Sequence, residues 1–524
     1  MTTPTETTTR QRRSILFLLA IAVLVVVMDL TILNVALQPI QRELKASQAA
    51  LQWCVDSYMI TFAAFIFTGG VCADRFGRKR TLMAALVIFG VASLLAALSG
   101  SIGQLVLCRA FMGVGAAAVP TVTLAIILNV FPPAERAKAI AVWAGAAGAA
   151  FAVGPVVAGA LLANFWWGSV FLVNVPLVVI GVVLIQLWIP ESKNPNNTHF
   201  DPAGLVLSIL AIAALVYGIV TGGENDDWTA PKTVAGLVVG VVLLLVLVPI
   251  ERRVPAPALD MSLFSKSRFT AGTAAIALSF FGLMGAIFIL TFYFQSIRDY
   301  SAFEAGLLML PMGIGSMAMS SRCPKLVPLV GGRTVVAAGA IAMAVTFGLY
   351  ALCGAGTSVA VIVVLQLLFG LGWGCIMAPA TGALMSVVPL PKAGAGQAVS
   401  QTLRQVGAAL GVAVIGSVLS VAYRSSLGSA VNILPADLRT AARGSVGATQ
   451  QAIATAAGRG LNASALRSRS VDAYLHGMHI SMVIAAVVAL AVALISLRWL
   501  PGRPPSPAAG AEQAPAATTA PAGR

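Results

Sequence analysis

Long apolar runs separated by short polar segments set the pattern of the whole chain. A helix needs about 20 apolar residues to cross a hydrocarbon core of about 30 Å. Fourteen runs approach or exceed that length, and they predict an all-α integral membrane protein. The runs fall at about 14–36, 53–70, 81–99, 105–130, 137–163, 168–189, 203–222, 233–250, 270–294, 304–321, 334–353, 359–387, 397–422 and 475–497.

The polar segments place the ends of the chain. If the N-terminal tail, residues 1–13, is cytoplasmic, the inner loops and tails carry 21 lysines and arginines, whereas the short outer loops carry four. This bias follows the positive-inside rule and predicts that both termini are cytoplasmic. The long outer loop at 423–474 holds six arginines, but long loops cross largely regardless of charge. Residues 501–524 are Pro/Ala-rich and predict a disordered cytoplasmic tail.

Composition excludes several classes of protein. The chain is 58% hydrophobic and only 10% charged, which is far from the balance of a soluble domain. Its net charge of +15 arises from cations in short loops, where membrane orientation explains them better than nucleic acid does. The first run is longer than a signal-peptide core and shows no convincing cleavage site, so we expect it to be retained as a span.

Neither a metal nor a cofactor is indicated. The six cysteines are scattered, without a C-x-x-C pair, and behave as small buried apolar residues. His476 and His479 are spaced to share one helix face, yet two ligands at a membrane interface are a weak metal signal. No Walker-type phosphate loop is present, which disfavours an ATP-driven pump.

The most charged turn lies between the second and third runs and reads G-G-V-C-A-D-R-F-G-R-K-R-T over residues 69–81. Four cations surround one acid, Asp74, and the glycines allow a sharp turn and close backbone approach. The stretch resembles the signature loop between helices 2 and 3 of the major facilitator superfamily. The residues that carry the resemblance are Gly70, Asp74, Arg75, Gly77 and Arg78.

Further stretches resemble one branch of that superfamily, the fourteen-span drug:proton antiporters. M-D-L-T-I-L-N-V-A-L-Q-P (28–39) is similar to its helix-1 motif, and Arg109 with Gly113 and Gly115 is similar to its helix-4 motif. The pattern called the antiporter motif is matched by Gly145, Gly154, Pro155 and Gly159. In the second half, Y-F-Q (293–295) and R-Q-V-G-A-A-L-G (404–411) also fit, and 321–334 looks like a worn copy of the charged turn, without a match for Asp74.

The resemblance implies an architecture. Residues 14–189 and 270–500 would form two six-helix bundles, and residues 203–250 would form two inserted helices. Binding would occur near mid-membrane, between the bundles.

Three ionisable residues fall within the outer half of the first bundle. Asp29, Asp56 and Arg109 are each expensive in a membrane, which makes each a functional candidate. Burial disfavours an ionised carboxyl, whereas a nearby cation favours it. We therefore expect Asp29 and Arg109 to couple transport to protons. The alternative is that they only neutralise one another to permit folding.

Other polar and aromatic positions are candidates for substrate binding. Asp56, near the outer mouth, would attract cations, or would be simply a hydrated interfacial acid. Arg404 lies among glutamines that form one helical stripe. The full set of candidates is Asp56, Trp53, Tyr58, Asn34, Gln295, Gln401, Gln405 and Arg404.

The charged turn and the antiporter motif are expected to act in conformational change. By resemblance, Asp74 pairs with Arg78 and faces the N-terminal end of helix 11, which is the run at 334–353 in the order above. Also by resemblance, the bend at Pro155 packs against a helix of the second half and keeps that interface tight.

Together these features predict proton-coupled efflux of amphipathic, often cationic, drugs or toxic compounds across the bacterial plasma membrane. The chain would act as a monomer in the bilayer, without a cofactor. Export of one endogenous metabolite, lipid or siderophore remains an alternative that the motifs do not separate. A membrane enzyme is disfavoured because it would need a His-Asp, Ser-His or metal cluster in the membrane, and the chain has only three histidines.

Overall fold

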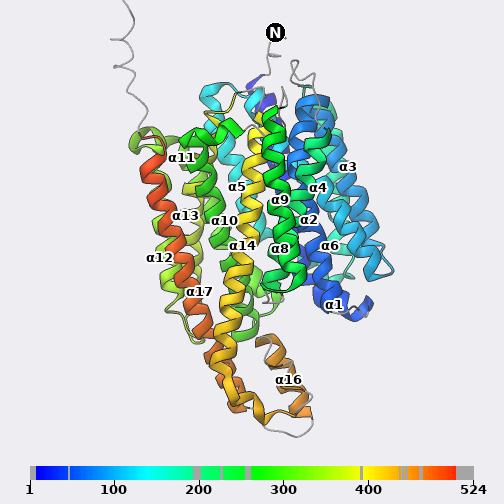
Figure 1. Ribbon diagram of the computed structural model, residues 1–524, viewed down its shortest axis with the longest axis vertical. Helices are drawn as coiled ribbons and strands as arrows, with labels where there is room; N and C mark the ends of the chain where they lie inside the picture. The colour runs from blue at the N-terminus through cyan, green and yellow to red at the C-terminus, as the bar shows by residue number, and fades with distance from the viewer. Residues whose placement is uncertain are drawn as a thin grey trace, which may run out of the picture.

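The computed structural model describes residues 8–44, 46, 48–192, 202–224, 228–253, 261–389, 393–435, 438–439, 442, 446–458 and 464–502, and in these residues it is all-helical (Figure 1). The helices of the first half are α1 Thr9–Leu44, α2 Gln48–Phe76, α3 Arg78–Ala97, α4 Ile102–Val130, α5 Pro133–Asn164, α6 Ser169–Leu172 and α7 Asn174–Trp188. The middle pair is α8 Pro202–Glu224 and α9 Pro231–Arg253. The second half holds η1 Met261–Ser265, α10 Ser267–Phe292, η2 Tyr293–Ile297, α11 Ala302–Val330, α12 Gly332–Tyr350, α13 Val359–Met385, α14 Ala393–Leu427, η4 Gly428–Ile433, α16 Val446–Gly458 and α17 Ser464–Trp499.

Each of the fourteen apolar runs is helical in the structure. Ten of the described helices are long and apolar enough to cross a membrane, and the number rises to twelve when α2 and α5, which are bent, each count as one span. The remaining two, α8 and α9, carry shorter apolar stretches at Val206–Gly222 and Pro231–Leu247. The all-helical, multi-pass architecture is therefore confirmed, whereas fourteen spans stays a prediction.

The helices form two bundles that meet along two seams. In the first bundle α2 packs on α4 and α1 on α5, and in the second α11 packs on α13 and α12 on α17. One seam joins α5 to α11, and the other joins α14 to α2 and α4. A site at the centre of the molecule therefore has walls from both bundles.

The inserted pair α8–α9 sits against the second seam, because α8 contacts both α2 and α14. Close approach of α8 to α9 depends on glycine: an added Cβ at Gly218 would lie 2.6 Å from the backbone of Leu237. The Trp228 Nε1–H of the connecting turn donates to Ser417 Oγ of α14 over 3.3 Å. The pair is thus tied to both halves.

Both ends of the described chain lie at one end of the bundle, and α16 lies at the other (Figure 1). The predicted outer loop at 423–474 is shorter than expected, because α14 continues to Leu427 and α17 begins at Ser464. Hydrogen bonds fix α16 in place. Tyr423 and Thr449 share one of 2.7 Å, and the Gln450 amide donates to the Ser296 carbonyl in the π-helical turn η2.

Two helices of the first bundle are bent. α5 bends by 42° between Ala150 and Val153. Pro155 explains this bend, because its ring nitrogen cannot donate to the carbonyl four residues earlier, at residue 151. α2 bends by 45° around residue 67, just before the glycine pair Gly69–Gly70.

Candidate functional site

A fully buried ion pair joins α1 to α4. Asp29 is 0% exposed and Arg109 is 1% exposed, and Arg109 Nη1 lies 2.5 Å from Asp29 Oδ2. The two residues are 80 positions apart, so the contact forms only when the bundle assembles. The predicted pairing of Asp29 with Arg109 is confirmed as geometry, and its role in coupling stays a proposal.

The surroundings of Arg109 hold its guanidinium in one orientation. Its Nε–H donates to the Cys54 carbonyl of α2 over 3.1 Å, and its Cζ atom lies 4.2 Å from the centre of the Tyr58 ring. Tyr58 in turn donates to the Val26 carbonyl of α1 over 3.3 Å. Tyr58, which we expected to bind substrate, is therefore 0% exposed and supports the ion pair in this structure.

Two polar residues that the sequence analysis did not single out complete the site. Asn174, the first residue of α7, donates from Nδ2 to Asp29 Oδ1 over 3.2 Å and also lies 3.1 Å from Ser93 Oγ. Ser93 of α3 donates to the Phe171 carbonyl over 2.9 Å. Both oxygens of Asp29 thus accept hydrogen bonds. The available signal was a lone asparagine inside the apolar stretch F-L-V-N-V-P-L (171–177).

The remaining first-half candidates lie in several places. Asp56 is buried on α2 in this conformation. Trp53 is exposed and stacks on Tyr217 of α8, with ring centroids 6.0 Å apart, so it links α2 to the inserted pair. The side chain of Asn34 lies outside the described residues.

The antiporter motif places α5 against both bundles. A Cβ at Gly154 would meet Thr31 Oγ1 and would lie 3.0 Å from the Met28 carbonyl, in the turn of α1 that carries Asp29. One turn further, a Cβ at Gly159 would lie 3.0 Å from the Phe303 side chain of α11. Gly145 likewise faces α11, where an added Cβ would lie 3.5 Å from Met317 Cα. The predicted packing of the Pro155 region on a second-half helix is confirmed, and α11 is that helix.

Within the charged turn, Gly77 is the single residue between α2 and α3, and its φ is 108°. Asp74 and Arg78 flank it, are 4% and 6% exposed, and form an ion pair of 3.3 Å, as the resemblance implied. The carboxylate of Glu191, just after α7, accepts from the backbone N–H groups of Lys79 and Arg80 over 3.1 and 3.3 Å. An acid at a helix N-terminus is favourable, and this one was missed because it lies more than 100 residues away.

The prediction that the charged turn faces the helix of the run at 334–353 was wrong. α12, the helix of the run at 334–353, packs against α13 and α17, on the far side of the second bundle, whereas α2 packs against α14 (Figure 1). Helix order along the chain does not determine which helices of the two bundles face each other.

The worn second copy of the turn keeps its backbone form. Gly331 joins α11 to α12 with φ 89° and ψ 146°, close to the 108° and 139° of Gly77. In each copy, the segment that follows the last helix of the bundle (α7 or α17) accepts a backbone hydrogen bond at the start of the helix after the turn (α3 or α12). Ser192 accepts from Arg78 N over 2.8 Å, and Pro501 accepts from Arg333 N over 3.0 Å.

The second-half candidates for substrate binding lie at two separate places, with Gln295 at one of them and Gln401, Arg404 and Gln405 at the other. Gln295 is exposed at the outer end of α10, in η2. α10 and α14 run side by side with Gly407 against Ala277 and Gly411 against Phe281. This register places Gln295 about 20 residues, or roughly 30 Å, beyond Gln405 along the bundle axis. Gln295 therefore does not line one pocket with Gln401, Arg404 and Gln405.

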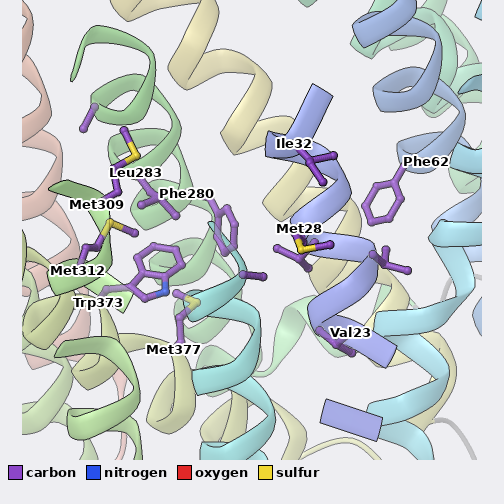
Figure 2. Packing of buried hydrophobic residues seen from close by; sticks show 14 of the residues in the cluster. Val23, Met28, Ile32, Phe62, Phe280, Leu283, Met309, Met312, Trp373 and Met377 are labelled. Atoms are coloured by element: carbon purple, nitrogen blue, oxygen red, sulfur yellow. The ribbon is translucent and has the colours of Figure 1, made fainter. Parts of the chain in front are cut away.

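Methionine and aromatic side chains pack at the centre between the bundles. They belong to one buried cluster, in which Phe280 lies between Trp373 and the helix α1 that carries Met28 (Figure 2). Trp373 Nε1 would lie 3.4 Å from a Cβ on Gly148, which places the indole at the seam with α5. Flexible thioethers and rings adapt to varied apolar shapes.

Two helical bundles around a shared centre, with a buried ion pair in one of them, define a multi-pass membrane transporter. The chain belongs to the Major Facilitator Superfamily, whose family model matches residues 19–412. Its fold is similar to that of the proton:xylose symporter XylE, with a TM-score of 0.62 over 94% of this chain and 96% of the other, at 14% identity.

Two relatives are similar in sequence. The chain is 34% identical over 495 residues to the multidrug efflux pump LfrA of Mycolicibacterium smegmatis, a match that covers 94% of this chain and 97% of the relative. It is 32% identical over 419 residues to the multidrug resistance protein Stp of Mycobacterium tuberculosis, covering 79% and 78%.

The geometry of the charged turn makes a prediction about stability. Gly77→Ala should lower the free energy of unfolding by roughly 1–3 kcal/mol, because alanine is strained at this φ. Its Cβ would also lie 2.5 Å from Glu191 Oε1. Thermal unfolding of the purified protein in detergent measures the effect. Gly103→Ala is the matched control, since a Cβ there meets nothing within 4 Å; equal melting temperatures for the two variants would contradict the prediction.

Proposed function

We propose that the protein exports amphipathic drugs or toxic compounds across the bacterial plasma membrane in exchange for protons, by alternating access. The observation that carries the proposal is the buried Asp29–Arg109 pair in a superfamily member whose named relatives LfrA and Stp are multidrug proteins. The methionine and aromatic side chains between the bundles support a site for varied apolar substrates.

The hydrogen bonds around Asp29 support its role in coupling. In this conformation the carboxylate accepts from Arg109 and Asn174. A nearby cation favours the charged form of a carboxyl group, so loss of the Arg109 contact would favour proton uptake. Outward or inward movement of α1 relative to α4 would separate the pair and allow the exchange.

The packing of α5 supplies a mechanical connection. Gly154 contacts the α1 turn next to Asp29, and Gly159 contacts α11 of the other bundle. A rocking motion of one bundle against the other along the α5–α11 seam is therefore transmitted to the turn that holds the acid. Asp56, buried on α2, is the proposed attractor for cationic substrates.

Export of a single endogenous compound remains the second candidate. The methionine and aromatic side chains at the centre favour a broad range of substrates, because flexible thioethers do not enforce one shape. Neither candidate requires a cofactor, and both use the same coupling pair.

Asp29→Asn should abolish proton-driven efflux. The amide cannot take up a proton, and it leaves the Arg109 charge uncompensated, so the free energy of unfolding should also fall by about 3–5 kcal/mol. Proteoliposomes with an imposed pH difference and a fluorescent amphipathic cation measure the transport. Glu43→Gln, at an exposed acid on the same helix, is the control and should transport normally. Uphill transport by the Asp29→Asn protein would show that another group couples transport to protons.

Asp74→Asn should shift the balance between outward-open and inward-open states about several-fold, because it removes the Arg78 ion pair at the end of α2. Labelling of single cysteines introduced on each face, in a background without the six native cysteines, measures the shift. Asp299→Asn is the control, since it removes an exposed ion pair with Arg467 at the opposite end. Identical labelling of the wild type and Asp74→Asn would rule out a gating role for this acid.

A further inference from the structure

Arg404 is a half-buried cation within a helix of the second bundle, and among the described residues it has no ionic partner. It lies eleven residues into α14, about 16 Å from the start of that helix and thus near mid-membrane. Among the described residues it makes no ion pair and no hydrogen bond, and its Nε atom is inaccessible. The buried arginine of the first bundle, Arg109, is by contrast paired with Asp29.

The second bundle contains no acid at the level of Arg404. Its four acids are Asp299, Glu304, Asp437 and Asp472, and the chain from 305 to 436 contains none. The contacts of Gly407 with Ala277 and of Gly477 with Leu419 place Asp299 and Asp472 far along the helices from Arg404. An uncompensated guanidinium in a membrane protein is expensive and is normally paired or faces a polar cavity. The missing partner is therefore an anion from elsewhere.

The contacts of Arg404 direct it to the centre of the molecule. Its Cζ atom lies 4.7 Å from the centre of the Phe280 ring, and Phe280 packs edge-to-face on Trp373 with centroids 4.8 Å apart. Trp373 reaches the seam with α5, beside Gly148. The guanidinium thus contacts the ring of Phe280, which lies beside Trp373 in Figure 2.

Further polar groups near Arg404 also lack partners. Gln401, one turn earlier on α14, is 2% exposed, and neither atom of its amide has a hydrogen-bond partner among the described residues. Gln397, a further turn earlier, is 3% exposed with its Oε1 unpartnered. Buried amides without partners are rare in native proteins, and here they form one stripe with the guanidinium.

We propose that Arg404 and Gln401 form a recognition site for the carboxylate of an aromatic substrate, whose rings lie against Phe280 and Trp373. A guanidinium binds a carboxylate through two parallel hydrogen bonds, and the Gln401 amide can donate a third. This inference rests on the proposed export function and defines its substrate class. Substrates with both charges would use Arg404 for the carboxylate, whereas cations without a carboxylate would not need it.

Equilibrium binding of a matched pair of probes tests the site. The probes are a rhodamine dye with a free carboxylate and its methyl ester, which share one ring system and one cationic group. Fluorescence polarisation with the full chain in lipid nanodiscs reports both affinities without a proton gradient. Arg404→Gln should weaken binding of the acid by roughly tenfold to a hundredfold and leave the ester within about twofold.

Two further variants keep the test decisive. Arg404→Lys retains the charge without the two-pronged geometry, so the acid should lose less affinity than in Arg404→Gln. Arg322→Gln removes an exposed arginine of α11 that donates only to the Ala318 carbonyl, and it should bind both dyes as the wild type does.

The outcomes separate this inference from the proposed function. Equal losses for acid and ester in Arg404→Gln, or no loss for either, would overturn the carboxylate site. Arg404-dependent binding of the acid by a wild-type chain that exports neither dye would support the site and contradict export.

Discussion

A carboxylate and a guanidinium in an apolar helix bundle must be brought together, because each alone is costly to remove from water. Asp29 and Arg109 meet this constraint, and the first bundle is arranged around them. α1 and α4 supply the charges, α2 supplies the Cys54 carbonyl and the Tyr58 ring, and α7 supplies Asn174. Four helices are thereby fixed relative to one another at the depth of one acid.

Glycine sets the distances between the helices that surround this pair. The packing of α5 leaves no room for a side chain at Gly154, against α1, and little room at Gly159, against α11. Close backbone contact replaces the hydrophobic effect, which is weak between helices already in lipid. The same helix therefore contacts the α1 turn that carries Asp29 on one side and the second bundle on the other.

The sequence was sufficient for features that depend on depth. Hydropathy located the helices, and the rarity of charge in them identified Asp29, Arg109 and Arg404. The i, i+4 spacing on adjoining helices also agrees with the pairing of Asp74 with Arg78. These features follow from helical periodicity and from the cost of burying a charge. Both can be read from a residue and its neighbours in the sequence, without knowledge of distant contacts.

Features that depend on which helices face each other were not available from the sequence. Gln295 shares a bundle with Gln405 but lies roughly 30 Å away along it. Trp53 packs on α8, and α14 rather than α12 packs against α2. Asn174 and Glu191 bond to partners more than 100 residues away in the sequence. Hydropathy gives each helix a depth but no rotation about its axis and no neighbour.

The two chain segments that accept hydrogen bonds at the starts of α3 and α12 differ in charge, so the two bundles should respond differently to salt. Both halves use a neutral backbone carbonyl, that of Ser192 at α3 and that of Pro501 at α12, and only the first half adds a carboxylate, the side chain of Glu191. Salt screens interactions of exposed charges and leaves neutral hydrogen bonds largely unaffected. Rising ionic strength should therefore weaken the Glu191 contact at the start of α3 and leave the Pro501 hydrogen bond at the start of α12 largely unchanged. The two turns repeat in structure but differ in their response to salt.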